Sequence, residues 1–142
     1  MSDDKDTLIR QLLAAPVLGR LATSDPRTGQ PHVVPLWFLW DGEYAWMSAF
    51  KDTRKVKELR RNPRAALLVE PNSSHPSPLQ AVLLEGSVDL IEAPPEFIAE
   101  QALRIYVLYL GEQGVLASEP QSWAYDPQNL LIRLHPDRVF AW

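Results

Sequence analysis

The chain has no cysteine among its 142 residues. Disulfides, thiolate metal sites and cysteine nucleophiles are therefore excluded, because each of them requires a cysteine sulfur. Long apolar runs are absent as well, since none reaches the roughly 18 residues that a membrane-spanning helix needs. The acidic start, Met-Ser-Asp-Asp, lacks the basic and then apolar pattern of a signal peptide. Together these absences predict a cytoplasmic protein without a membrane partner.

An excess of positive charge is also missing. The sequence holds 14 basic and 18 acidic residues, which gives a formal net charge of -4. Proteins that bind the phosphate backbone of nucleic acids are generally basic, so we expect no nucleic-acid partner. Any anion-binding site must then be a local concentration of positive charge. At this length, with 46% hydrophobic residues, the chain is sized for one buried core. Residues 1–142 are therefore predicted to form a single domain.

Metal and hydrolytic sites find no support in the sequence. The three histidines, His32, His75 and His135, are scattered without metal-ligand spacing. No serine or threonine sits in a nucleophile elbow. We therefore expect no metal and assign no catalytic residue.

Turn residues and apolar alternation divide the chain into strands and helices. Six strands are predicted, over residues 17–23, 32–40, 44–49, 64–70, 80–92 and 129–134. Three helices are predicted, over residues 7–15, 52–62 and 94–110. The first three strands follow one another through short turns and should form a meander, and a turn is expected at His135-Pro-Asp. The fold class is therefore mainly β with peripheral helices, an antiparallel barrel.

Two glycines carry specific predictions. Gly86 lies inside the 80–92 strand, where an isolated glycine often marks a β-bulge. Gly111 follows the 94–110 helix and is placed to end it. The second half of that helix is apolar nearly all round, which predicts deep burial or packing against a partner subunit.

Positive charge is concentrated on one short segment of this acidic chain. Residues 51–64 contain seven basic and two acidic side chains. Thr53, Arg54 and Lys55 fall in the first turn of the predicted helix, where free N–H groups and the dipole attract an anion such as phosphate. Cations are disfavoured in a first turn unless an anion is present, which favours a phosphate site there. A solvated face that keeps the domain soluble explains the same charges, and the residues alone leave both readings open.

Tryptophans cluster in the segment before the basic helix. Trp37, Trp40 and Trp46 lie close together, and large aromatics are more often core than cofactor site. Trp37 differs because it follows Pro35, which interrupts a strand ladder and opens room for a planar ligand against the backbone.

Several blocks of this sequence resemble one protein family. They are Pro35-Leu-Trp-Phe-Leu-Trp-Asp-Gly42, Met47-Ser-Ala49, Thr53 to Arg64 with the strand after it, Tyr109-Leu-Gly111, and Leu134 to Trp142. Together they resemble the split-barrel flavin proteins, which include pyridoxamine 5′-phosphate oxidase and the flavin/deazaflavin oxidoreductases. The resemblance implies an antiparallel split β-barrel of the FMN-binding type.

The resemblance also implies a cofactor site. Arg54 and Lys55 would hold the phosphate of FMN or of an 8-hydroxy-5-deazaflavin coenzyme, with Thr53 assisting, whereas Lys57, Arg60 and Arg61 would be a solvated face. Six further residues complete the predicted cofactor-binding set: Val34, Pro35, Leu36 and Trp37 along the ring, Ser48 at the ribityl chain, and Trp142 from the closing strand.

Family members are homodimers with two cofactors at the subunit interface, so the resemblance implies a homodimer here. The family's oxidase continues past its closing tryptophan to an arginine and histidine pair that bind its substrate, so vitamin B6 oxidation is not expected of a chain that stops at Trp142. Our first hypothesis is an FMN-dependent oxidoreductase that transfers hydride between the flavin and an unidentified small-molecule substrate. The alternatives are a deazaflavin-dependent reductase and a non-catalytic module that stores or senses flavin.

Overall fold

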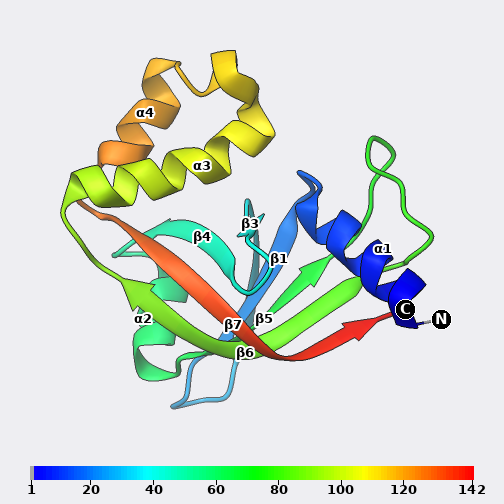
Figure 1. Cartoon of the computed structure of the whole chain (residues 1–142). Helices are drawn as coiled ribbons and strands as arrows, with labels where there is room; N and C mark the ends of the chain where they lie inside the picture. Colours follow the sequence, from blue (N-terminus) through cyan, green and yellow to red (C-terminus); the bar gives the residue numbers. More distant parts are fainter. Residues whose placement is uncertain (1) are drawn as a thin grey trace.

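The protein is built on one antiparallel sheet of seven strands that curls into an open barrel (Figure 1). A computed structural model describes the backbone of residues 2–142 and the side chains from residue 4 onward. The strands are β1 (Gly19–Ser24), β2 (Pro31–Leu36), β3 (Leu39–Trp40), β4 (Ala45–Phe50), β5 (Arg64–Val69), β6 (Val82–Ile91) and β7 (Asn129–Ala141). Their order across the sheet is β2-β1-β5-β6-β7-β4-β3.

Four helices in the described part of the chain lie around this sheet (Figure 1). They are α1 (Ser2–Ala14), α2 (Arg54–Arg61), α3 (Pro95–Gly114) and α4 (Ser118–Tyr125). In Figure 1, α3 and α4 lie together above the β4 side of the sheet, and α2 lies on the opposite side of the molecule. The predicted class, mainly β with peripheral helices on an antiparallel split barrel, is therefore confirmed.

Buried apolar side chains form two clusters. The larger one fills the curl of the sheet and is closed by α1 and α2, with Leu21, Met47 and Leu67 among its fully buried members. The smaller one lies between α3, α4 and the β3–β4 hairpin, and includes Ala102 and Ile105. The apolar half of the predicted 94–110 helix is thus largely used inside this chain.

The predicted three-strand meander is wrong. β1 does pair with β2, and β3 with β4, but β4 takes β7 as its other neighbour and β2 stands at the far edge of the sheet. Turn residues report which consecutive strands form a hairpin, and they carry no information on partners that are distant in sequence. The predicted 32–40 strand is accordingly split into β2 and β3.

A side chain from α3 holds the break between β2 and β3. The Tyr109 hydroxyl accepts a hydrogen bond from the Phe38 N–H at 3.1 Å and lies 2.9 Å and 3.0 Å from the carbonyl oxygens of Val17 and Phe38. These contacts replace the ladder bonds that the chain loses as it leaves the sheet. Burial raises the pKa of Tyr109 to about 12, so the hydroxyl stays protonated and able to donate at neutral pH.

We expect Tyr109→Phe to lower the free energy of unfolding by about 1–3 kcal/mol, because the partly buried N–H and C=O groups of the break lose their shared partner. Chemical denaturation of the two proteins measures the difference. Tyr125→Phe is the matched control, because Tyr125 is exposed and removal of its hydroxyl should leave stability unchanged. Equal stability of all three proteins would contradict a structural role for this hydroxyl.

The bulge predicted at Gly86 is confirmed. The register between β6 and β7 shifts between Glu85 and Gly86: Glu85 pairs with Arg138 and Gly86 with Pro136, so Asp137 of β7 is the extra residue. The turn predicted at His135-Pro-Asp is wrong, since β7 runs without interruption through these residues. Proline fits a strand at a bulge, where a ladder hydrogen bond is already missing.

The helices differ from prediction at their ends. α1 begins at Ser2, more than one turn before the predicted start at residue 7. Gly111 has φ 77° and ψ 170°, which ends the regular helix after Leu110 as predicted, although α3 resumes as far as Gly114. The short helix α4 was not predicted.

Candidate functional site

The candidate site is built around the first turn of α2, which follows directly after β4. Val56 and Leu59 are fully buried and anchor one face of this short helix to the core, as the apolar stripe predicts. Thr53 is the N-cap residue, but its hydroxyl donates to the Phe50 carbonyl at 2.8 Å and does not cap the helix. The first N–H groups of α2 are therefore left without a side-chain acceptor, as an anion site requires.

A pocket of about 250 Å³ opens beside this first turn. Three residues of the predicted set line it together: Ser48 from β4, Thr53 at the N-cap and Lys55. The complete lining is Ser48, Ala49, Phe50, Thr53, Lys55, Tyr106, Trp123 and Asn129. Three of the nine predicted cofactor-binding residues therefore line this pocket.

Lys55 gives the pocket its charge. Its side chain is partly buried, and this burial lowers the pKa of the ammonium group below its usual range. Among the described residues, no carboxylate forms an ion pair with Lys55. A partly desolvated cation without a partner is costly, and an anionic group bound in the pocket would remove that cost.

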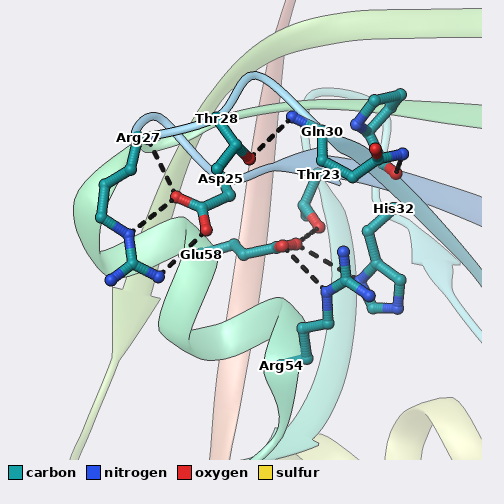
Figure 2. A network of polar contacts seen from close by, with 9 residues as sticks. Thr23, Asp25, Arg27, Thr28, Gln30, His32, Arg54 and Glu58 are labelled. Carbon is teal, nitrogen blue, oxygen red and sulfur yellow. Dashed lines mark hydrogen bonds and ion pairs between the residues drawn. The ribbon is translucent and has the colours of Figure 1, made fainter.

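Arg54 and Lys55 point in different directions although they are consecutive in sequence. The Nε of Arg54 donates to Oε2 of Glu58 at 3.0 Å (Figure 2), and Arg54 does not line the pocket. Adjacent helical residues lie about 100° apart around the axis, so they rarely serve one ligand. The structure therefore does not bring Arg54 together with Lys55.

Glu58 is a buried carboxylate at the centre of the contacts shown in Figure 2. It accepts a hydrogen bond from the Thr23 hydroxyl at 2.6 Å, and Nδ1 of His32 lies 3.3 Å from it. Burial acts to raise the pKa of Glu58, but the hydrogen bonds from Thr23 and Arg54 together hold this pKa below its usual range. The charged carboxylate thereby ties α2 to β1 and β2.

This lowered pKa makes a prediction about stability and pH. Because Glu58 binds its proton less tightly in the folded state, its contribution to stability is present above its ordinary pKa of about 4.3 and is lost as pH falls through the lower, folded value. Unfolding by urea from about pH 6 to about pH 3 should show Glu58→Gln less stable than the parent chain, with the difference shrinking in acid. A difference that stays constant over this range would contradict the assignment.

The far wall of the pocket consists of residues that the sequence prediction missed. Tyr106 of α3 and Trp123 of α4 meet edge to face at 6.1 Å between ring centroids, and Asn129 begins β7. The hydroxyls of Ser48 and Tyr106 share a hydrogen bond of 2.8 Å. Burial raises the pKa of Tyr106, which keeps this phenol neutral. Glu119 and Pro120 in the first turn of α4 were the available signal for that helix.

The remaining predicted residues lie outside the pocket. Trp37 stacks on Tyr109 with 5.0 Å between the ring centroids, and its ring centroid lies 5.9 Å from that of Tyr106 in the aromatic wall. Trp37 does not line the pocket itself. Val34, Pro35 and Leu36 are on β2, the edge strand at the other end of the sheet order.

Trp142 does not line the pocket either. It follows β7 beside β6, its backbone pairs with that of Gln80 and Ala81, and its side chain is 54% exposed. Within one copy of the chain the structure thus gathers Ser48, Thr53 and Lys55, and leaves Trp142 and the β2 residues apart.

Two negative observations concern the described residues. No three His, Asp or Glu side chains among them converge as metal ligands would. No helix formed by them is long and apolar enough to cross a membrane.

The fold defines an antiparallel split-barrel protein, and a pocket lined by one partly buried lysine lies at the start of α2. A family model described as pyridoxamine 5′-phosphate oxidase matches residues 6–142. The chain belongs to this family. A comparison with curated proteins finds no match.

Several solved structures are also similar to this chain. An F420 reductase is 26% identical to this chain, with a TM-score of 0.74 over 92% of this chain and 94% of that protein. The conserved hypothetical protein Rv2991 of Mycobacterium tuberculosis is 24% identical, with a TM-score of 0.76 over 100% and 84% of the two chains. HutZ, a heme storage protein of Vibrio cholerae, is 16% identical, with a TM-score of 0.66 over 95% and 92%. The last two share the fold.

Proposed function

We propose that this chain is an FMN-dependent oxidoreductase that transfers hydride between the flavin and a small-molecule substrate, with the FMN phosphate bound beside Lys55. The observation that carries the proposal is the unpaired, partly buried Lys55 ammonium in a pocket at the start of α2. Backbone N–H groups of the first turn supply further donors, and the Ser48 hydroxyl can donate when the Tyr106 hydroxyl donates to it. When bound, the flavin ring provides the redox chemistry, and the protein orients it.

The size of the pocket supports a site completed by a second copy of the chain. Its volume of about 250 Å³ lies below the roughly 300–1,000 Å³ of sites that enclose a whole ligand. The phosphate and part of the ribityl chain fit within such a space, and the ring must extend beyond it. We therefore include a homodimer with the cofactor at the subunit interface in the proposal.

Exposed apolar side chains support the homodimer. Leu18 precedes β1, and Phe140 and Trp142 lie at the end of β7; all three are more than 40% exposed. The strand register aligns these exposed residues in one row across the sheet. Their sequence neighbours are paired in turn: Gly19 with Val69, Val69 with Val82, and Val82 with Ala141. Burial of this row between two copies would remove exposed apolar surface and would allow Trp142 of one copy to approach the cofactor of the other.

A deazaflavin coenzyme is the alternative cofactor. The specific observation in its favour is the 26% identity to an F420 reductase over nearly the full length of both chains. Its phosphate would use the same donors, so the pocket by itself does not choose between the two cofactors.

Titration decides between them. The purified chain is mixed with FMN or with the deazaflavin coenzyme, and quenching of cofactor fluorescence gives the two dissociation constants. Tighter binding of FMN supports the proposal, tighter binding of the deazaflavin supports the alternative, and saturable binding of neither contradicts both. Bound cofactor that no nicotinamide donor reduces would instead indicate a storage or sensing module.

A further inference from the structure

A second cleft lies on the opposite side of α2 from the cofactor pocket. It has a volume of about 460 Å³, runs between α2 and the turn that joins β1 to β2, and shares no lining residue with the first pocket. Its lining is Asp25, Pro26, Arg27, Asp52, Arg54, Lys57, Glu58 and Arg61. Figure 2 shows part of this region, with Asp25 and Arg27 on the turn facing Arg54 and Glu58 on the helix.

One face of α2 carries a row of cations into this cleft. Arg54, Lys57 and Arg61 are spaced at i, i+3 and i+7, which places them along a single helical face. Lys57 and Arg61 are like charges four residues apart, an arrangement that destabilises a helix unless an anion lies between them. Arg60, which points elsewhere, is compensated by Glu92 at 2.9 Å.

The acidic side chains of the cleft are mostly committed to other partners. Both oxygens of Asp25 accept hydrogen bonds from the Arg27 guanidinium, at 3.2 Å and 3.0 Å. Glu58 is already paired with Thr23 and Arg54. Lys57 and Arg61 form no close ion pair among the described residues, although the charge of Arg61 helps to lower the pKa of Asp25 across the cleft. Asp52 is the one lining carboxylate among the described residues that makes no ion pair. This leaves a local surplus of positive charge on a chain whose net charge is -4.

Two carboxylate side chains that line the cleft are held by hydrogen bonds before any ligand binds. The side chain of Glu58 is held by the Thr23 hydroxyl of β1 and by Arg54 of its own helix, and Asp25 also accepts a hydrogen bond from the Arg27 N–H at 2.9 Å. Donors whose positions are already set bind an anion with a smaller loss of side-chain entropy. The cleft thus combines space, unpaired cations and a rigid frame.

We propose that this cleft is a second anion-binding site, which takes the phosphate or carboxylate group of a small molecule through Lys57 and Arg61, independently of the cofactor pocket. Arg61 offers a planar fork of donors that matches either group, and Lys57 adds a point charge. Lys57, Arg60 and Arg61 are all exposed, as expected of a solvated face. The proposal adds a ligand for Lys57 and Arg61, whereas Arg60 pairs with Glu92.

The test is a titration of the full-length, ¹⁵N-labelled chain with inorganic phosphate, and in parallel with glutarate, at constant ionic strength maintained with sodium chloride. Amide resonances of the 25–29 turn and of residues 57–61 report on the cleft, and those of Ser48 and Thr53 report on the cofactor pocket. We expect saturable shifts at the cleft. The double variant Lys57→Ala, Arg61→Ala should weaken the dissociation constant there by at least about tenfold, because two charge-assisted contacts are lost.

Two further variants separate this site from its surroundings. Arg60→Ala removes the same charge from the same helix and should leave the cleft affinity unchanged, and Lys55→Ala should affect only the resonances of the cofactor pocket. Saturation by phosphate alone or by glutarate alone supports the site and identifies its chemistry. The proposal is overturned if neither anion saturates the cleft, if Arg60→Ala weakens binding as much as the double variant, or if Lys55→Ala abolishes the shifts at both places.

Discussion

Replacement of Lys55 by alanine is expected to weaken FMN binding by about 10- to 100-fold, the largest effect of any single substitution in the proposed cofactor site. Among the described residues, Lys55 is the one cation that lines the pocket, and it is partly buried with its pKa already lowered by desolvation. A phosphate in that environment loses its counter-charge completely when the ammonium is removed, because water screens the remaining charge poorly. Fluorescence quenching of FMN measures the change in the dissociation constant.

Arg60→Ala is the matched control for this experiment. Arg60 belongs to the same helix, but its guanidinium pairs with Glu92 on the surface, so its loss should leave FMN affinity within about twofold. Lys55→Arg should retain part of the affinity, since it keeps the charge and changes the geometry. Equal affinities of the Lys55→Ala and Arg60→Ala variants would place the phosphate elsewhere.

The behaviour of Arg54 illustrates what sequence alone could and could not predict about the site. The concentration of basic residues predicted a phosphate site at the start of α2, because helix starts and surplus charge are both visible in the sequence, and the structure has a pocket there. The partner of Arg54 is Glu58, one turn later, and this pair could have been predicted from its i, i+4 spacing. That Glu58 would be buried could not, because its burial depends on Thr23 and on the position of β1.

Long-range pairing limits the fold prediction in the same way. The local signals identified most strands, the bulge at Gly86 and the end of the regular helix at Gly111. They could not indicate that β4 pairs with β7, since some 80 residues separate the two strands and no turn connects them. The aromatic wall of the pocket, Tyr106 and Trp123, was missed for this reason, because it forms only when α3 and α4 fold back over β4.

The close approach of β6 and β7 gives the largest expected effect on stability. A Cβ atom added at Gly86 would overlap the carbonyl group of His135 and stand 2.8 Å from the Cα of Pro136. These are backbone atoms of β7 within its pairing with β6, so they cannot move aside as a flexible side chain would. We expect Gly86→Ala to cost about 3 kcal/mol of unfolding free energy and to lower the melting temperature by roughly 10 °C.

Gly29→Ala separates this steric effect from the conformational effect of replacing any glycine. Gly29 has φ 73°, but a Cβ there would meet no atom within 4 Å. The substitution should therefore cost only about 1 kcal/mol, from backbone strain alone. Thermal and urea unfolding of the two variants measures both values. Gly86→Ala that is no more destabilising than Gly29→Ala would contradict the prediction and would mean that the bulge can widen. In that case the register of β7 beyond Pro136, including the position of Trp142, is less firmly fixed than its pairing with β6 indicates.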